Sequence, residues 1–273
     1  MSAGRRVPLL PERPRPLVFA HRGCSSLAPE NTMASFRKAR ELGAPGLELD
    51  VHACGAGSSG VSSFGELVVA HDDTFERTAS PEHNGEGKDI EALTLAEIRR
   101  IDVGSFFDPA FSGEHPPLLE EVLEEFCPDM YIDIELKSRR TRNDLLPGLV
   151  AAKLKSLGDR VKGAVTLSSF NPFCLAAFKR LCPQFPTALI WSASFEVPLI
   201  LRHGLGRFFA HCDYVKPVHT QVNPLRYFQM DKLEGLPIVP WTIDDPALAG
   251  HLLNLGCQGI ITNRPQDMKD LLP

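Results

Sequence analysis

The stretch VTLSSFNPFCLAAFKRLCP, residues 165–183, joins a short apolar run to a segment with helical spacing. Residues 165–170 are a candidate strand, and residues 171–183 are compatible with a helix. A strand followed by a helix is the repeating unit of a parallel α/β sheet. From Tyr131 onward each apolar run is followed by a helix-compatible segment, as at residues 245–256. This part of the chain therefore predicts a parallel sheet built from βα units.

Nine apolar runs are candidate strands, and they lie at residues 17–22, 46–51, 67–71, 131–137, 165–170, 187–191, 213–217, 237–243 and 259–263. Eight βα units close a (β/α)8 TIM barrel of roughly 250 residues, so one run is in excess. The connection between Val51 and Leu67 is rich in Gly and Ser, whereas parallel neighbours need a crossover that is usually a helix. We therefore predict that residues 67–71 lie outside the barrel wall. They would begin an insertion after the second strand, over about residues 53–117.

The length and composition fit one large α/β domain or two smaller ones. The chain has 273 residues, of which 43% are hydrophobic and 23% are charged. Residues 1–16 are rich in proline and arginine and have no periodicity, which predicts a flexible leader. Because the βα pattern is continuous beyond it, we expect a single barrel domain over residues 17–273.

Charge, apolar runs and cysteine usage exclude several classes of protein. A formal charge of -5 argues against a sequence-independent nucleic-acid binder, which needs a basic face. The sequence contains no apolar run of the length of a signal peptide or a membrane-spanning segment. The seven cysteines are scattered without a C-x-x-C pair, and their odd number fits reduced thiols, so we expect a cytoplasmic protein. The sequence carries no signal for an oligomeric state.

Acidic side chains are placed where a barrel of this kind holds its active site, at the C-terminal ends of the strands. Side chains two residues apart on a strand share a face. In GLELDV, residues 46–51, Glu48 and Asp50 then point into the barrel mouth while the apolar residues face the helices. In YIDIELK, residues 131–137, the same alternation directs inward Asp133, Glu135 and Lys137.

Glu48, Asp50 and Glu135 are candidate metal ligands. Three carboxylates beside one lysine, Lys137, leave negative charge that burial would make costly, and a divalent cation would balance it. Oxygen-only ligation favours Mg²⁺ or Ca²⁺ over zinc, which prefers Cys and His. Asp133 is deeper by one pleat, and we expect it to form an internal ion pair instead.

Two histidines end apolar runs near this cluster. His21 is followed by Arg22 at the end of the first run, and His71 stands in VVAHDD. A lone histidine is more commonly structural, but two imidazoles near a metal are what acid–base catalysis at neutral pH requires. We expect the other seven histidines, His83 among them, to be surface residues in loops or on helices.

The chain from Leu17 nearly to its C-terminus resembles the glycerophosphodiester phosphodiesterase family. The motifs that carry the resemblance occur in the family's order, and they are HRG, APENT, FRKARELGA, ELDV, VVAHDDTFERT, LTLAEIRRIDVGSFF, PPLLEEVL, IDIELK, LSSF, PWTID and GIITNRP. Two places depart from the family's pattern. The loop over residues 52–66 is longer, and PPLLEEVL replaces the usual Pro-Thr-Leu before a helix.

The resemblance implies a TIM-barrel hydrolase whose residues match the family's roles. It implies that His21 and His71 are the general acid–base pair and that Arg22 and Lys137 hold the substrate phosphate. Trp241 matches an aromatic wall beside the substrate. The carboxylates implied as ligands of the divalent cation are Glu48, Asp50 and Glu135.

The implied reaction is hydrolysis of a small glycerophosphodiester to sn-glycerol 3-phosphate and an alcohol such as choline or ethanolamine. The nucleophile is either the glycerol 2-hydroxyl or water. An alternative within the same chemistry is a lysophospholipase D or a phospholipase C-like phosphodiesterase that acts on lipid substrates. A metal amidohydrolase would need an H-x-H motif that the first strand lacks. A barrel that only binds glycerophosphodiesters would have no need of two histidines flanking a metal.

Overall fold

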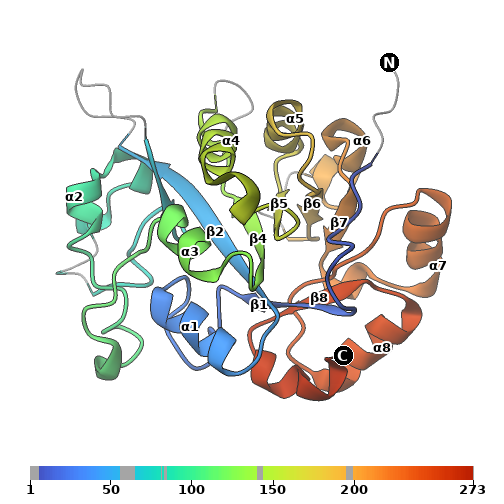
Figure 1. The fold of residues 1–273 in the computed structure, drawn as a ribbon, viewed down its shortest axis with the longest axis horizontal. Helices are drawn as coiled ribbons and strands as arrows, with labels where there is room; N and C mark the ends of the chain where they lie inside the picture. The colour runs from blue at the N-terminus through green and yellow to red at the C-terminus, as the bar shows by residue number, and fades with distance from the viewer. Residues whose placement is uncertain are drawn as a thin grey trace.

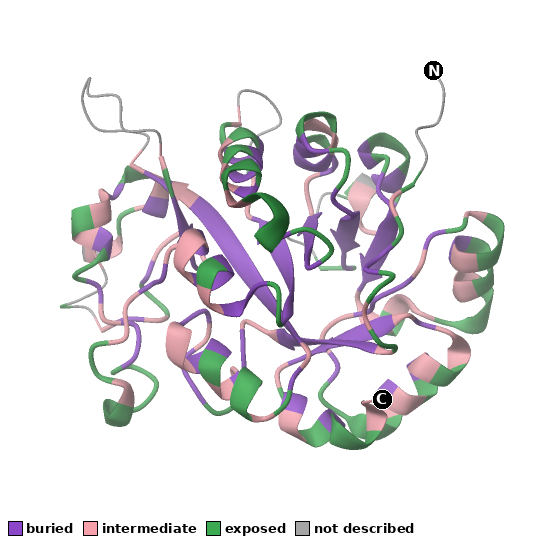
Figure 2. Cartoon of the chain, viewed as in Figure 1, coloured by how far each residue is buried: buried purple, intermediate pink, exposed green. Residues whose placement is uncertain are grey.

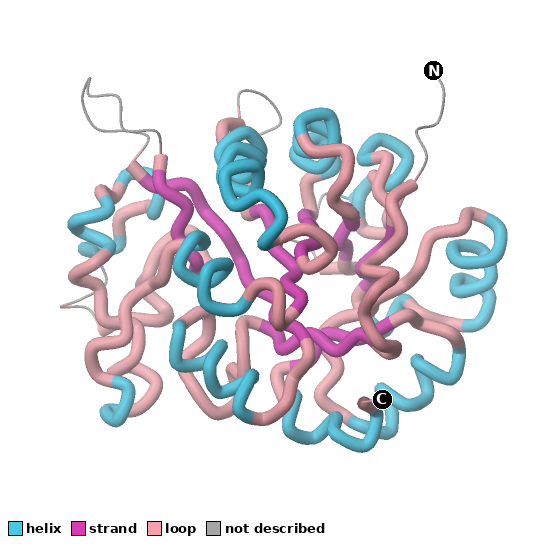
Figure 3. The backbone as a smooth tube through the Cα atoms, in the orientation of Figure 1, coloured by secondary structure: helices cyan, strands magenta, loops and turns pink. Residues whose placement is uncertain are grey.

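A computed structural model of the chain describes residues 6–55, 65–80, 82, 85–139, 144–194 and 199–272. Within these ranges one curled parallel sheet has the strand order β7-β6-β5-β4-β2-β1-β8. Its strands are β1 (Leu17–His21), β2 (Gly46–Cys54), β4 (Tyr131–Leu136), β5 (Val165–Ser169), β6 (Thr187–Trp191), β7 (Tyr214–Pro217) and β8 (Gly259–Thr262). The strands lie at the centre of the molecule and the helices are arranged around them (Figure 1, Figure 3).

The predicted eighth wall strand, residues 237–243, has no regular strand in the structure, but its backbone lies between the two ends of the sheet. It forms isolated parallel bridges to Val215 of β7 and to Val218 directly after β7. On the other side, the backbone N–H groups of Gln258 and Ile261 donate to its carbonyl groups at 2.9 and 3.1 Å. Pro237 and Pro240 explain the interruption, because proline has no N–H to contribute to a ladder.

The run predicted at residues 67–71 is β3 (Glu66–Val69), and it lies off the parallel path. It pairs antiparallel with β2, with Val51 opposite Val69. The prediction that this run is not one of the parallel strands is therefore confirmed. β2 is longer than predicted, because its last residues, 52–54, are the ones that pair with β3.

Helices begin where capping residues satisfy free N–H groups. The side chain of Asn171 accepts from the N–H of Phe173, and Asp245 accepts from Ala247, in both cases with a proline in the first helical turn. The α-helices are α1 (Met33–Glu41), α2 (Leu95–Ile98), α3 (Leu119–Phe126), α4 (Leu146–Leu157), α5 (Pro172–Leu181), α6 (Arg207–Ala210), α7 (Pro224–Tyr227) and α8 (Pro246–Leu255). The helical segments of 3-10 or π type are η1 (Gly85–Gly87), η2 (Ile90–Ala92), η3 (Pro109–Phe111), η4 (Gly158–Arg160), η5 (Leu199–Leu201), η6 (His219–Gln221), η7 (Phe228–Leu233) and η8 (Pro265–Leu271). No helix in the described ranges has both the length and the apolar character needed to cross a membrane.

The main apolar core lies between the outer face of the sheet and the helices (Figure 2). The apolar residues of β2 and β4 that were predicted to face outward are all buried in it, and they are Leu47, Leu49, Val51, Ile132, Ile134 and Leu136. Their polar neighbours must then face the opposite way, because side chains alternate along a strand. The predicted orientation of both strands is therefore confirmed.

Residues 6–16 pack against the sheet, which corrects the prediction of a flexible leader for this part of the chain. Leu9 and Leu10 are buried in a cluster with Phe19, Tyr131 and other residues of the strands. The physical reason is that these two apolar side chains cover aromatic residues that would otherwise face water. Residues 1–5 lie outside the described residues.

We expect Leu10→Ala to lower the free energy of unfolding by about 2–5 kcal/mol, because Leu10 is only 1% exposed. Leu145→Ala is the matched control, since Leu145 is 61% exposed and its loss should change stability by less than about 0.5 kcal/mol. Urea denaturation of the two variants measures the difference. Equal stabilities would mean that the segment does not pack on the sheet in solution.

Candidate active site

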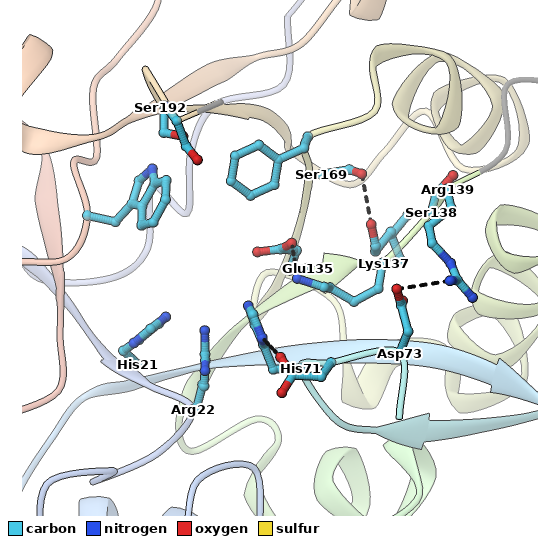
Figure 4. Close-up of a pocket in the computed structure, with 15 residues that line it drawn as sticks. His21, Arg22, His71, Asp73, Glu135, Lys137, Ser138, Arg139, Ser169 and Ser192 are labelled. Carbon is cyan, nitrogen blue, oxygen red and sulfur yellow. Dashed lines mark hydrogen bonds and ion pairs between the residues drawn. The ribbon is translucent and has the colours of Figure 1, made fainter. Parts of the chain in front are cut away.

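A pocket of about 740 Å³ opens at the C-terminal ends of the parallel strands. It is lined by residues that end or follow β1, β4, β5 and β6, among them Ser169 and Ser192. The structure brings six of the predicted site residues to its wall: His21, Arg22, His71, Glu135, Lys137 and Trp241. Figure 4 shows His21, Arg22 and His71 side by side, facing Glu135 and Lys137.

The other two predicted residues, Glu48 and Asp50, join Glu135 in one buried cluster. One carboxylate oxygen from each of the three residues lies within 4.8 Å of the others. The register of the sheet causes this, because Asp50 of β2 lies directly opposite Glu135 of β4. Burial, and then the charge of Asp50, raise the pKa of the Glu48 carboxyl well above its usual value. The cluster therefore holds like charges in a place where they repel strongly.

Lys137 and Arg22 face this cluster from the pocket side. Lys137 Nζ lies 3.0 Å from Glu135 Oε1 and 3.5 Å from Asp50 Oδ1. Arg22 Nε lies 3.4 Å from Asp50 Oδ2, and the Arg22 backbone N–H donates to Glu48 Oε2 at 3.2 Å. Burial opposes ionisation of Asp50, but the charges of Lys137 and Arg22 together hold its pKa below the usual range.

The turn after β1 fixes the direction of the Arg22 side chain. Arg22 has a φ of 55° and Gly23 a φ of 83°, so Arg22 occupies a conformation that costs a non-glycine residue about 1–2 kcal/mol. Position 23 requires glycine, since the Cβ of any other residue there would lie 1.9 Å from Ser35 Oγ. Asn31, in the same connection, donates from Nδ2 to Asp50 Oδ2 at 2.9 Å. The connection thus binds the buried carboxylate while it aims the arginine into the pocket.

Asp133 forms an internal ion pair, as predicted, and does not join the cluster. Its carboxylate lies 2.7 Å from Lys216 Nζ of β7 and accepts from Ser168 Oγ at 2.8 Å. Burial opposes the charge on Lys216, but Asp133, with smaller effects from Glu48 and Glu135, raises its pKa. Sequence reasoning did not identify Lys216. The alternation of side chains in DYVKP, residues 213–217, could have identified it, because Lys216 lies on the same strand face as Tyr214.

The donor set fits a hard divalent cation. Glu48, Asp50 and Glu135 offer three carboxylates, which two cationic side chains, Arg22 and Lys137, contact. Mg²⁺ and Ca²⁺ take carboxylate oxygens as ligands, whereas structural zinc prefers sulfur and nitrogen. Buried carboxylates this close to each other are stabilised by such an ion.

His21 is held by an amide. Its Nδ1 lies 2.6 Å from Asn263 Oδ1, and Asn263 in turn donates from Nδ2 to Asp244 Oδ2 at 2.8 Å. Since a carbonyl oxygen only accepts, Nδ1 carries the proton and Nε2 is the free ring nitrogen, 3.9 Å from Glu48 Oε2. Burial, and then the charge of Arg22, lower the pKa of His21 to about 4.

His71 follows β3 and is held by a carboxylate. Its Nδ1 donates to Asp72 Oδ1 at 2.6 Å, which leaves Nε2 as its other ring nitrogen.

His52, which the sequence predicts at the surface, is instead a buried residue of β2, and its Nε2 lies 3.3 Å from the backbone oxygen of His71. The reason is that β2 extends beyond Val51, so that His52 continues the inward series of Glu48 and Asp50. His83 lies outside the described residues.

Two aromatic rings form one wall of the pocket. Trp241 packs edge-on against Phe170, with ring centroids 5.7 Å apart, and both line the pocket. The Trp241 indole N–H donates to the backbone oxygen of Lys216 at 2.9 Å, which fixes the ring. Phe170 was not identified from the sequence as a site residue, although it is the last residue of the LSSF motif and directly follows β5 at the same barrel end.

Comparison with known proteins gives a consistent result. The model of the glycerophosphoryl diester phosphodiesterase family matches residues 21–267. A glycerophosphodiester phosphodiesterase of Caldanaerobacter subterraneus subsp. tengcongensis is 33% identical over 94% of this chain and 97% of its own length. One from Bacillus subtilis is 31% identical over 92% of this chain and 84% of its own.

Solved structures give the same family. An Oleispira antarctica phosphodiesterase in complex with the product sn-glycerol-3-phosphate matches with a TM-score of 0.77 and 28% identity, covering 94% of this chain and 96% of that one. A glycerophosphodiester phosphodiesterase from Agrobacterium tumefaciens matches with a TM-score of 0.73 and 25% identity, over 92% and 97% of the two chains. With the family's model matched along nearly the whole chain, this protein belongs to the glycerophosphoryl diester phosphodiesterase family.

Proposed function

We propose that this chain hydrolyses glycerophosphodiesters to sn-glycerol 3-phosphate and an alcohol, with a divalent cation, Mg²⁺ or Ca²⁺, and two histidines as general acid and base. One observation carries the proposal. A buried three-carboxylate cluster, two cationic side chains and two imidazoles converge on a single pocket. Names of relatives support the substrate class, since they include glycerophosphodiester phosphodiesterases and a complex with sn-glycerol-3-phosphate.

The same proposal extends to the architecture. Residues 17–273 form one domain, a (β/α)8 TIM barrel in which residues 237–243 close the wall between β7 and β8. In support, that segment has backbone bonds to both strands. An insertion after the second strand, about residues 53–117, carries His71. In support, residues of this region, including Phe75, Ile90 and Ile98, form a small apolar cluster of their own.

In this mechanism Arg22 and Lys137 bind the substrate phosphate. Arg22 suits this role because its planar guanidinium presents several N–H donors that match phosphate oxygens. Glu48, Asp50 and Glu135 hold the cation, which when bound stabilises negative charge on the phosphoryl oxygens and makes a hydroxyl easier to deprotonate. The wall formed by Trp241 and Phe170 confines the non-reacting part of the substrate.

The two histidines differ in the group that holds them, and this supports different roles. His21, held by the neutral amide of Asn263, keeps a lone pair on Nε2 and removes the proton from the nucleophile, which is the glycerol 2-hydroxyl or water. His71 donates from Nδ1 to the carboxylate of Asp72, which fixes the orientation of its ring, and it gives a proton to the departing alcohol oxygen as the P–O bond breaks.

The cysteines support a reducing compartment. All seven lie in the described part of the chain, and each is buried and free. Burial raises the pKa of the thiols, for example that of Cys54 to about 11, which keeps them protonated and unreactive. We therefore place the protein in the cytoplasm.

The direct test of the function is release of glycerol 3-phosphate from glycerophosphocholine by the purified chain. We expect excess chelator to abolish the release and Mg²⁺ or Ca²⁺ to restore it, because the carboxylate cluster depends on a cation. Lysophosphatidylcholine assayed in parallel tests the lipid alternative. Full activity in excess chelator would contradict metal dependence, and turnover of the lipid alone would contradict the substrate class.

Glu135→Gln should weaken the binding of Mg²⁺ or Ca²⁺ measured by calorimetry at least about tenfold, because Glu135 is one of the clustered carboxylates. Asp133→Asn is the comparison, since Asp133 is bonded to Lys216 and Ser168 below the cluster. It should leave the affinity for the ion nearly unchanged while it lowers the melting temperature, because Lys216 loses its partner. Equal losses of affinity would place Asp133 among the ligands.

His21→Ala and His71→Ala should each lower kcat on glycerophosphocholine roughly 10²- to 10⁴-fold, the usual contribution of general acid–base catalysis. A p-nitrophenyl phosphodiester of glycerol separates the two roles, because p-nitrophenolate departs without a proton. His71→Ala should recover most of its rate on that substrate, whereas His21→Ala should not. If His21→Ala is the variant that recovers, the two roles are reversed; if neither recovers, the two-histidine scheme fails.

A further inference from the structure

Outside the pocket wall, Arg77 links two of the site residues through a chain of alternating charges. Arg77 Nε donates to Asp72 Oδ2 at 2.5 Å, and Asp72 Oδ1 accepts from His71. On its other side Arg77 binds both oxygens of Glu30, at 2.6 and 2.9 Å. Glu30 Oε1 also accepts from Arg22 Nη1 at 2.9 Å. The chain therefore runs without a break from the imidazole of one site residue to the guanidinium of another.

The two ends of this chain come from different parts of the fold. Arg22 and Glu30 lie in the connection between β1 and α1, whereas His71, Asp72 and Arg77 lie in the segment that follows β3. The first connection is tied to the buried cluster, because Arg22 Nε contacts Asp50. The second is attached to the sheet through the β2–β3 pairing. Arg77 thus joins the segment that carries His71 to the loop that carries Arg22.

The arrangement requires a guanidinium. Three of its nitrogens contact two carboxylates at once, and each of these carboxylates also binds a pocket residue. An ammonium group is a compact point charge and does not reproduce a planar fork of donors. A lysine at this position would bind either Asp72 or Glu30 well, but would not hold the two in a fixed relation.

We propose that Arg77 is a positioning residue for the phosphodiesterase reaction: it sets the place and ring orientation of His71 relative to Arg22 by holding Asp72 and Glu30 together. The inference rests on the proposed function, because it acts through the two groups assigned there to the acid and to phosphate binding. Arg77 does not itself line the pocket. Its effect on the reaction is indirect.

A purely structural role predicts a different outcome. The Arg77 side chain is 49% exposed, and ion pairs at such places contribute little to the stability of a fold. Displacing a catalytic group by about 1 Å, however, lowers rates by as much as about 100-fold. A positioning role therefore predicts a large loss of kcat with a small change of stability.

The test compares Arg77→Met with Arg99→Met. Arg99 is a matched control in the same region of the chain, since it is 41% exposed and binds both oxygens of Glu121, away from the pocket. We expect Arg77→Met to lower kcat on glycerophosphocholine roughly 10- to 100-fold. Arg99→Met should retain wild-type kcat, and the two variants should melt within a few degrees of each other.

The leaving group supplies the readout that a structural defect would not change. On the p-nitrophenyl phosphodiester of glycerol, which needs no acid, Arg77→Met should recover most of its kcat. Its KM should stay raised on both substrates, because Arg22 has also lost a fixed partner. Arg77→Lys should fall between wild type and Arg77→Met. An equal loss on both substrates, or an Arg77→Met variant that behaves like Arg99→Met, would overturn the proposal.

Hydrogen exchange makes the inference testable apart from the activity. Backbone amides of residues 71–80 should exchange faster in Arg77→Met than in wild type and should be unchanged in Arg99→Met, because Arg77 joins this segment to Glu30. If wild type does not hydrolyse glycerophosphocholine, the proposed function fails, and exchange alone then decides whether Arg77 holds the segment. Unchanged exchange in Arg77→Met would overturn the positioning role in either case.

Discussion

Mutual repulsion among three buried carboxylates, Glu48, Asp50 and Glu135, is the constraint on which the rest of this site depends. Their oxygens gather within 4.8 Å because β2 and β4 are adjacent and in register. Such a group is costly to bury unless cations surround it. Arg22 and Lys137 supply two of these charges from the pocket side. The same two residues are then already in place, and charged, where a phosphate would meet them.

Charge balance also explains the layers beneath and around the cluster. Below it, Asp133 forms an ion pair with Lys216 and accepts a hydrogen bond from Ser168, so that its charge adds little to that of the three carboxylates. Beside it, Arg22 is shared between Asp50 and Glu30. Because Arg22 divides its charge between two carboxylates, Glu30 also binds a second cation, Arg77, which lies outside the pocket. The ion pairs of Glu30 and Arg77 outside the pocket therefore continue the charge pairing that begins at Asp50 inside it.

Much of this arrangement could be predicted from the sequence, because strand alternation is a local property. The spacing of Glu48, Asp50 and Glu135 along their strands decides which face each occupies, and the sheet then brings them together. Lys216 and His52 follow the same alternation, but the sequence did not predict the ion pair of Lys216 or the burial of His52, for two physical reasons. Lys216 meets Asp133 only through the order of strands β4 to β7. His52 is buried because pairing with β3 lengthens β2.

Other differences arise where tertiary contacts override local composition. Proline and arginine in residues 6–16 indicate an unpacked segment, yet Leu9 and Leu10 between them are buried. Prolines within residues 237–243 interrupt regular strand pairing, although the segment is bonded to both neighbours. A composition averages over residues, whereas packing depends on individual side chains. Two buried leucines, together with hydrogen bonds such as those from Val7 to Asp213 and from Arg13 to Asp129, therefore hold in place a segment whose composition predicts no packing.

The two histidines of the pocket are held by two different kinds of contact. His21 ends a central strand and is held by an amide that is itself fixed by Asp244. His71 lies beyond the sheet, on a segment that is held near the pocket by backbone hydrogen bonds, by His52 and by charged side chains. Hydrogen bonds within the barrel therefore hold the first imidazole, whereas the second is also linked to the barrel through ion pairs. The chain of ion pairs through Arg77 ends at His71, whereas His21 is bonded to Asn263, directly after β8.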